Sequence, residues 1–337
     1  MSSWANRGIP RKRNLSQIPE ALRPTIIPRS EHPHVVLSES LQKPKNEILY
    51  PSGLEDSKPS TPDMELYSRS APKRTVDWSP SPSAITLRHD DKSYVFVILR
   101  HIGMTRDNNL WTSSYHSIRK FYTNPIIIID DNSKINTVNG KLVNTEIIQS
   151  EFSGAGEILP YYYFLQHKWA DRMIFLHDSM FLNRPFKESE LSGLIRFHWY
   201  FDNTEIREQN KINTYLSMLR NHEGLLDFAK TNKSWKGCFG GATIVDLQIV
   251  EHLEKKYDFF STLTLSIKSR KERETFERLL GIVVYYEKMI EEPCSNFGLI
   301  TQYPNAFESQ HTDYPTATHV VSQHKYNTAI LKVWRGR

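Results

Sequence analysis

Residues 126–133 read IIIIDDNS, a run of four isoleucines that continues directly into two aspartates, an asparagine and a serine. An unbroken run of β-branched apolar residues predicts a strand that is buried on both faces, as in a parallel sheet. The runs YVFVIL at residues 94–99 and MIFL at residues 173–176 predict two further strands of this kind, and EII at residues 146–148 predicts a shorter one. The pattern therefore indicates a sheet that is covered on both sides.

Helical segments separate the predicted strands. Trp111, Tyr115 and Ile118 recur at helical spacing, and a second helix is expected after Gly156, through about Lys168. Alternating strands and helices with short links predict an α/β fold, with a mostly parallel central sheet and helices on both faces. Ligands of such sheets bind outside the carboxyl ends of the strands. A functional site is therefore expected where these strands end.

The first 90 residues differ in composition from the rest of the chain. Twelve of the 18 prolines lie there, among Ser, Lys, Arg and Glu and without a sustained apolar period. A segment that buries so little apolar surface does not offset the entropy of ordering it. The sequence therefore predicts a disordered or loosely attached Pro-rich tail over residues 1–90 and a folded domain over residues 91–337.

Charge, cysteine content and hydropathy narrow the class of protein. Lys and Arg number 43 against 38 Asp and Glu, and no basic stripe with interleaved aromatic residues is present, so we expect no nucleic-acid partner. Two cysteines, Cys238 and Cys294, imply no disulfide framework and fit a reducing compartment. No apolar run approaches the roughly 18 residues of a membrane span, and none follows Met1 to Pro10 as in a secretory signal. We therefore expect a cytoplasmic protein without a membrane span.

Acidic residues and glycines follow the predicted strands at the ligand-binding edge. Asp130 and Asp131 can accept hydrogen bonds from a base or from ribose hydroxyls, although aspartates at strand ends also form turns. Gly154 and Gly156 allow close backbone approach and precede a helix whose N-terminus favours negative charge, although this segment could also be an ordinary loop. Asp178 ends the fourth strand and offers a hard oxygen ligand for a divalent cation. Together these groups suit a ligand with hydroxyls and phosphates.

The order of strand, helix, strand ending in DDNS, small-residue loop, helix and strand ending in an acid resembles the nucleotide-binding half of family 2-like glycosyltransferases of the GT-A fold. The likeness covers roughly residues 93–337, and LHDSM at 176–180 and KVWRGR at 332–337 are similar to uncharacterised glycosyltransferase-like proteins of large DNA viruses. The resemblance implies that Asp130 and Asp131 contact the base and ribose of the donor.

The resemblance also divides the domain. It implies a nucleotide-sugar-binding half over residues 91–186, in which Gly154, Gly156 and Asp178 belong to the donor site. Residues 187–337 are then the acceptor-binding and catalytic half.

The family carries an Asp-x-Asp motif that holds a divalent cation on the diphosphate. Asp178 matches its first aspartate, but Met180 stands where the second would be. The resemblance implies Mn²⁺ or Mg²⁺ as cofactor, with Asp178 and a C-terminal histidine as ligands. We take His324 as this histidine, with His319 as the alternative. With a single carboxylate left, the metal is either held partly by a residue elsewhere or not needed.

Two glycines in the second half are candidate donor-sugar contacts. Gly240 and Gly241 precede an apolar strand, and a comparable segment lies under the donor sugar in GT-A enzymes. Paired glycines at a strand start also occur as bulges. Trp235 nearby could stack on a sugar or belong to the core.

A candidate general base lies on the helix predicted from about Arg270. Inverting transfer needs a base to deprotonate the acceptor hydroxyl, and Glu277 flanks the apolar stripe, where burial would raise the pKa of its carboxyl. A salt pair with Arg273 would explain Glu277 equally well. Glu274 and Arg278 have the spacing of a surface ion pair.

The resemblance implies a glycosyltransferase of the hexosyltransferase type (EC 2.4), which transfers a sugar from a nucleotide-diphosphate sugar, expected to be a UDP-sugar, to the hydroxyl of a glycan or another acceptor. One alternative is a non-catalytic nucleotide-sugar-binding or scaffold protein with the same fold. Another is a nucleotidyltransferase, which would need a glycine-rich basic loop after the first strand. Residues 100–106, RHIGMTR, hold one glycine and match that loop poorly.

Overall fold

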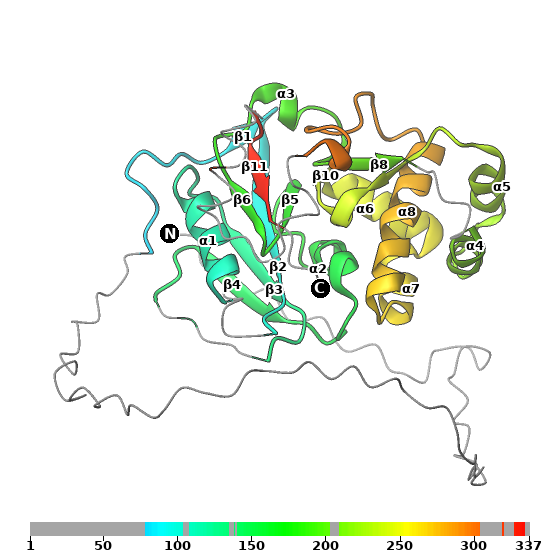
Figure 1. Ribbon diagram of the computed structural model, residues 1–337, viewed down its shortest axis with the longest axis horizontal. Coiled ribbons are helices and arrows are strands. Elements are labelled where there is room, and N and C mark those ends of the chain that lie inside the picture. The colour runs from blue at the N-terminus through cyan, green and yellow to red at the C-terminus, as the bar shows by residue number, and fades with distance from the viewer. Residues whose placement is uncertain are drawn as a thin grey trace, which may run out of the picture. The chain divides into compact units, whose positions relative to one another are not determined.

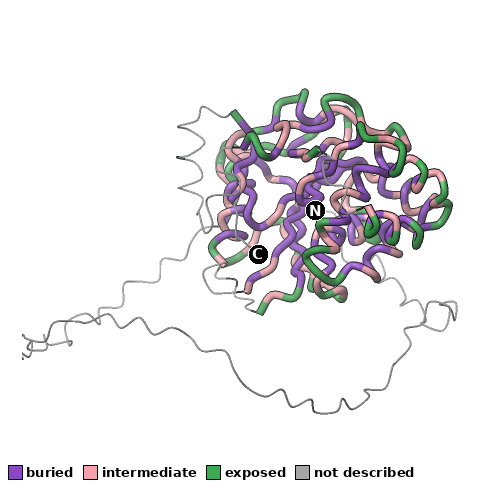
Figure 2. The backbone as a smooth tube through the Cα atoms, turned by 45° about the vertical axis from the view of Figure 1, so that its right-hand side comes forward, coloured by how far each residue is buried: buried purple, intermediate pink, exposed green. Residues whose placement is uncertain are grey.

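The structure of the protein is a computed structural model that describes residues 78–103, 108–134, 138, 140–202, 209–303, 319 and 327–333. All of these residues belong to one compact unit. Figure 2 shows that its buried segments run through the middle and its exposed segments lie at the rim.

The largest sheet of the described residues has seven strands in the order β4-β3-β2-β5-β10-β7, with β1 paired to β2. The bounds along this order are Thr145–Gln149, Ile126–Asp130, Lys92–Arg100, Arg172–His177, Thr243–Asp246 and Ile195–Phe197, and β1 spans Arg88–His89. Strands β4, β3, β2 and β5 are parallel, whereas β10 is antiparallel to both of its neighbours. These pairings confirm the predicted mostly parallel sheet. The apolar runs of β2, β3 and β5 are buried, as expected of strands that are covered on both faces.

Parallel register brings the strand ends together at one edge. Arg100 of β2 lies opposite Asp130 of β3, and Leu99 lies opposite His177 of β5. The residues that follow these strands therefore meet at the same edge of the sheet, as the sequence predicted.

Helices cover both faces of the sheet. Phe96 of β2 stacks on Tyr122, just after α1, whereas Phe175 of β5 packs on Tyr161 of α2. Phe175 is in register with Val97, whose side chain points away from that of Phe96, so the two contacts lie on opposite faces. The helices α1, α2, α3, α4, α5, α6, α7 and α8 span Asn108–Arg119, Leu159–His167, Glu188–Leu191, Gln209–Ser217, Glu223–Thr231, Leu247–Tyr257, Phe259–Ser266 and Arg270–Tyr286. In Figure 1, α6, α7 and α8 gather on the right, with α4 and α5 beyond them.

The described residues also form two small sheets and three short 3₁₀ turns. β6 pairs with β11 and β8 pairs with β9, both antiparallel. These strands span Met180–Leu182, Ile330–Lys332, Tyr200–Asp202 and Lys236–Cys238. The 3₁₀ turns η4, η6 and η7 span Gly156–Ile158, Phe239–Gly241 and Ile300–Gln302. The β11–β6 pair brings the end of the chain back beside the segment that follows β5.

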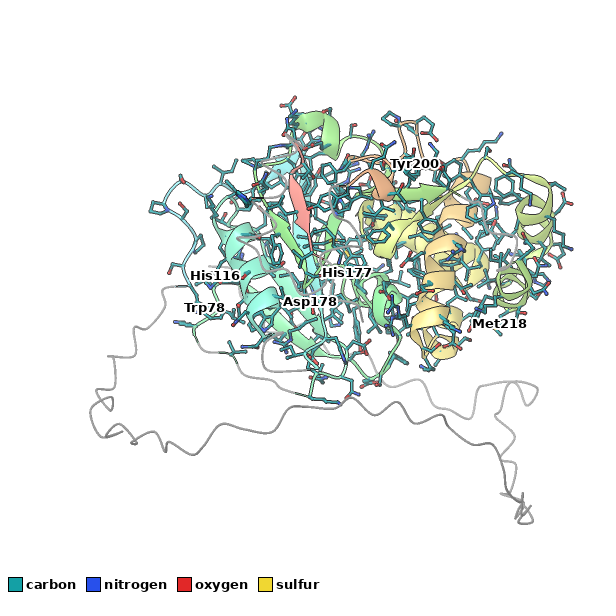
Figure 3. All side chains as sticks on the ribbon, viewed as in Figure 1. Trp78, His116, His177, Asp178, Tyr200 and Met218 are labelled. Carbon is teal, nitrogen blue, oxygen red and sulfur yellow. The ribbon has the colours of Figure 1, made fainter. Side chains whose placement is uncertain are left out.

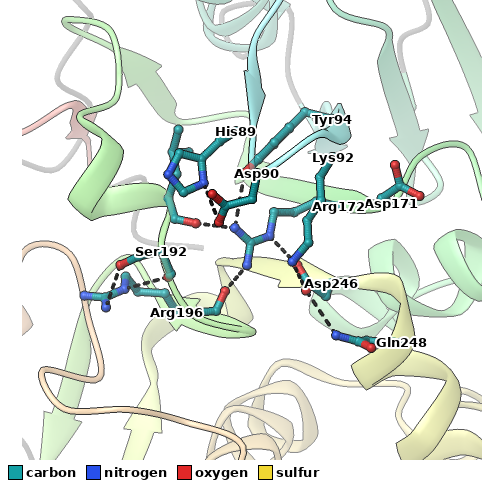
Figure 4. A network of polar contacts seen from close by, with 12 residues as sticks. His89, Asp90, Lys92, Tyr94, Asp171, Arg172, Ser192, Arg196, Asp246 and Gln248 are labelled. Carbon is teal, nitrogen blue, oxygen red and sulfur yellow. Dashed lines mark hydrogen bonds and ion pairs between the residues drawn. The ribbon is translucent and has the colours of Figure 1, made fainter.

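A polar network around the buried Arg172 lies at the opposite ends of the strands, away from the edge where β2, β3 and β5 end (Figure 4). Arg172 pairs with Asp246 and donates to the carbonyl oxygens of Leu191 and Gly193. Lys92 donates to the same aspartate at 2.6 Å. This network joins β2, β5 and β10 at the end remote from the strand ends described above, and its buried charges are paired as their desolvation requires.

The folded part of the chain begins before the predicted boundary at residue 90. Trp78 is buried beside Trp111, Tyr115 and His116, and its carbonyl oxygen accepts a hydrogen bond from Tyr115 at 3.0 Å. Figure 3 shows Trp78 and His116 side by side. Leu87 is buried as well. Residues 78–90 therefore pack on the domain, whereas residues 1–77 of the expected tail lie outside the described part.

No helix among the described residues is long and apolar enough to cross a membrane.

Candidate functional site

A cleft of about 740 Å³ lies at the carboxyl ends of β2, β3 and β5. Residues that follow these strands line it together with α8 and the end of β11. The polar side chains of the lining are His101, Asp131, Asn132, Ser153, Glu157, His177, Asp178, Ser179, Arg270, Arg273, Glu274, Glu277, Arg278, Thr301 and Lys332. Figure 3 places His177 and Asp178 near the middle of the molecule. The cleft lies where ligands of parallel sheets bind.

Asp130 lies outside this lining. Its side chain is fully buried, with Oδ2 at 2.6 Å from Nε of Arg100. Oδ1 accepts hydrogen bonds from the N–H of Ser133 at 2.8 Å and from Nε2 of Gln149 at 3.0 Å. Burial raises the pKa of Asp130, but the hydrogen bonds from Ser133 and the charge of Arg100 outweigh it and leave this pKa below its usual value. The geometry gives Asp130 a structural place rather than the expected donor contact, because both carboxylate oxygens are bound inside the protein.

Asp131 lines the cleft and holds the glycine loop. Its Oδ1 accepts the N–H of Gly154 at 2.7 Å, and its Oδ2 accepts the N–H of Gly156 at 3.1 Å. Both glycines have positive φ angles, of 82° and 56°. The N–H groups of the two glycines are thus bound to a carboxylate of the protein.

Asp178 lies at the predicted place in the cleft. It is 4% exposed, and its Oδ2 accepts the N–H of His101 at 3.1 Å. The His101 ring donates from Nδ1 to the carbonyl oxygen of Asp131 at 2.6 Å. His101 therefore connects the ends of β2, β3 and β5, and it is a cleft residue that the sequence reasoning missed. Its position directly after a buried strand was the signal that could have identified it.

A hydrogen bond joins His177, at the end of β5, to Gly240 in η6. His177 Nε2 donates to the carbonyl oxygen of Gly240 at 2.6 Å. The φ of Gly240 is +64°, and a Cβ there would lie 2.8 Å from that nitrogen. Gly241 does not line the cleft, and its carbonyl oxygen accepts a hydrogen bond from the buried Tyr161 hydroxyl at 2.5 Å. His177 thus faces the cleft and fixes one of the two predicted glycines.

Glu277 lies in the cleft on α8. Burial raises the pKa of Glu277 well above its usual range, and the nearby carboxyl of Glu157 raises it further. A hydrogen bond from the Gly240 backbone N–H opposes this shift. Arg273 pairs with Glu157, at 2.9 Å between Nε and Oε2, so Glu157 rather than Glu277 takes the salt pair considered from the sequence.

Further side chains of α8 form contacts that the sequence did not predict. Glu274 forms its ion pair with Arg270, at 3.2 Å between Nε and Oε1. Arg278 instead donates from Nη1 to the backbone oxygen of Glu274 at 2.7 Å, and its guanidinium lies over the ring of Phe201. Both arginines line the cleft.

Lys332 enters the cleft from the end of the chain. Its Nζ donates to Oγ of Ser179 at 2.6 Å, next to Asp178. Nothing in the local sequence predicts this placement, because it depends on the pairing of β11 with β6, about 150 residues earlier.

Other predicted residues lie elsewhere. Trp235 is 1% exposed and belongs to the core. His319 is exposed, and His324 lies outside the described residues. The described part of the chain contains no group of three or more His, Cys, Asp or Glu side chains that could hold a metal ion.

No family model matches the chain, and no curated protein sequence matches it. Among solved structures, it is similar to core-mannan synthase A from Aspergillus fumigatus in its Mn/GDP form, at 13% identity and a TM-score of 0.35, over 61% of this chain and 73% of that one. It is also similar to TarS from S. aureus, at 10% identity and a TM-score of 0.29, over 56% of this chain and 55% of that one. Both are glycosyltransferases of the GT-A type.

Proposed function

We propose that this protein is a glycosyltransferase that binds a nucleotide-diphosphate sugar in the cleft and transfers the sugar to a hydroxyl of a glycan or another acceptor. A UDP-sugar is the donor we expect. The observation that carries the proposal is that a carboxyl with a raised pKa, Glu277, lines the same cleft as the strand-end residues Asp131 and Asp178. A titratable group with a perturbed pKa in a cleft at the end of a parallel sheet is typical of a catalytic site.

Glu277 is the proposed general base. In its ionised form it accepts the proton of the acceptor hydroxyl while that oxygen forms a bond to the anomeric carbon. The bond from this carbon to the donor phosphate breaks at the same time, and the nucleoside diphosphate leaves with the electron pair. A raised pKa makes Glu277 a stronger base than an exposed carboxylate, and the N–H of Gly240 holds the ionised form in place.

The donor lies, in this proposal, along the strand ends. Asp131 shapes the loop of Gly154 and Gly156 beside it, Asp178 lies toward the diphosphate, and Gly240 lies under the sugar. Asp130 and Gly241 support these residues from outside the lining, through Arg100 and Tyr161.

The residues of the cleft fit the implied Mn²⁺ or Mg²⁺ poorly. Mg²⁺ in such sites is held by one or two carboxylates together with substrate phosphates and water, in a surrounding that carries no competing cation. Asp178 offers one carboxylate, Met180 takes the place of the second, and the ammonium of Lys332 lies beside them on Ser179. The reaction proposed above therefore involves no metal ion.

A thermal-shift screen of nucleotide sugars tests the proposed function. A donor at about 100 times its dissociation constant should stabilise the protein by about 2.7 kcal/mol. Release of nucleoside diphosphate from the same donor separates a transferase from a non-catalytic binding protein. Release of pyrophosphate from a nucleoside triphosphate and a sugar 1-phosphate, with formation of the nucleotide sugar, would indicate a nucleotidyltransferase. A protein that no nucleotide sugar stabilises would contradict the proposal.

A further inference from the structure

A lysine stands beside the strand-end aspartate of the cleft. Lys332 lies opposite Met180 in the β11–β6 pair, and its Nζ donates to Oγ of Ser179 at 2.6 Å. The buried neighbours Leu331 and Val333 anchor the strand, so the position of the ammonium is set by the core. An ammonium has three N–H donors, so it can hold Ser179 and a phosphate oxygen at the same time.

A second cation, Arg273, packs against the glycine loop. Arg273 bonds to Glu157 through Nε, at 2.9 Å, and to the carbonyl oxygen of Gly154 through Nη1, at 3.1 Å. Its side chain crosses Gly156 so closely that a Cβ there would lie 2.1 Å from Cδ of the arginine. Burial raises the pKa of Glu157, and both Arg273 and Lys332 oppose that shift. The two cations therefore act on one carboxyl group and share one region of the cleft.

The backbone of the loop contributes little positive potential to this region. The N–H groups of Gly154 and Gly156 point at the carboxylate of Asp131. Amides that already hold a carboxylate do not offset the roughly two negative charges that a diphosphate brings. The side chains of Lys332 and Arg273 supply positive charge in this part of the cleft.

We infer that Lys332, together with Arg273, binds the diphosphate of the donor in the place of a divalent cation, so that nucleoside diphosphate binding needs no metal. This inference rests on the proposed function. An ammonium supplies a point charge and a guanidinium supplies a planar pair of donors, and both are common partners of phosphate.

Isothermal titration of the full chain with UDP and with uridine, in EDTA and in Mn²⁺, tests the inference. The parent protein should bind UDP equally well in both buffers. Lys332→Gln should weaken UDP binding by about tenfold or more, because it removes a charge-assisted hydrogen bond, and should leave uridine binding unchanged. Lys332→Arg should retain most of the affinity. Lys230→Gln, at an exposed position on α5, is the matched control and should bind UDP like the parent protein.

The possible outcomes separate this inference from the proposed function. UDP binding that requires Mn²⁺ and is lost in His324→Ala would overturn the inference and leave the glycosyltransferase proposal in place. UDP binding that is unchanged in a folded Lys332→Gln protein, as judged by its melting temperature, would also overturn it. A parent protein that binds neither UDP nor uridine would rule out the expected UDP-sugar donor, and the inference with it, whereas the proposed function fails only if no nucleotide sugar stabilises the protein.

Discussion

The raised pKa of Glu277 should make the stability of the folded protein depend on pH. Burial and the neighbouring Glu157 raise its pKa well above 4.5, the usual value in an unfolded chain. The folded protein therefore binds this proton to a higher pH than the unfolded chain does. The stability that this group contributes is present below pH 4.5 and is lost as the pH rises toward the folded pKa.

Glu277→Gln cannot ionise, so it should reduce the decline in melting temperature above pH 4.5 and melt like the parent protein below that pH. Thermal unfolding followed by circular dichroism across this range measures the effect. Glu291→Gln, at an exposed position outside the cleft, should follow the parent curve. Parallel curves for the parent protein and Glu277→Gln would show that this carboxyl is not buried as described.

Asp130 leads to a different prediction. Because it is fully buried against Arg100, Asp130→Asn leaves a buried guanidinium without its counter-charge. We expect a loss of about 3–5 kcal/mol in the free energy of unfolding, measured by urea denaturation. Glu274→Gln, which breaks the half-exposed pair with Arg270, should cost less than about 1 kcal/mol. A stable Asp130→Asn protein with weakened nucleotide binding would instead support the donor contact that the sequence suggested.

The rule that ligands bind where parallel strands end predicted part of the site. It failed for Asp130, because the direction of that side chain depends on a partner from another strand. Asp131 and Asp178 reach the cleft because residues after parallel strands meet at one edge. Asp130 is one residue earlier than Asp131, and the alternation of the strand turns its carboxylate inward to Arg100. Whether such an aspartate faces a ligand or a buried arginine depends on the partner, which lies on another strand.

At the scale of elements, the glycine loop 153–156 depends on close packing against α8 and the residues just before it. A Cβ on Gly154 would lie 2.6 Å from the carbonyl oxygen of Lys268, and one on Gly156 would meet Arg273. Both glycines have positive φ, a conformation that costs an alanine about 1–2 kcal/mol by itself.

Gly298 provides a matched control for that backbone cost. Its φ is +80°, and a Cβ there would meet nothing within 4 Å. Gly298→Ala should therefore cost about 1–2 kcal/mol, whereas Gly154→Ala should cost clearly more, because a backbone oxygen cannot move aside as a side chain can. Urea denaturation of both variants measures the difference. Equal losses would show that conformation alone, and not contact with Lys268, requires a glycine at position 154.

The elements themselves were predictable to different degrees. The buried strands β2, β3 and β5 follow from apolar runs, and α8 follows from the spacing of Phe276, Leu279 and Val283. The three-residue strands β6 and β11 carry no such signal. They form because their residues pair with each other, and this pairing places Lys332 in the cleft.

At the scale of the whole molecule, the start of the folded domain is testable. A chain that begins at Ser70 retains the buried Trp78 and Leu87, and it should melt like the full chain. A chain that begins at His89 loses both residues, and removal of a buried tryptophan alone typically costs about 3–5 kcal/mol. Thermal unfolding of the two shortened chains beside the full chain compares them. Equal melting temperatures would restore the boundary near residue 90 that composition suggested.

The most direct test of the central claim is the release of nucleoside diphosphate from a panel of nucleotide sugars, followed for the parent protein and for Glu277→Gln. The parent protein should release the nucleoside diphosphate from at least one donor. Glu277→Gln should bind that donor with similar affinity and release the product about 100-fold or more slowly, because a general base contributes at least that factor. Equal rates in the two proteins would contradict the assignment of Glu277, and a parent protein that neither binds nor cleaves any nucleotide sugar would contradict the account as a whole.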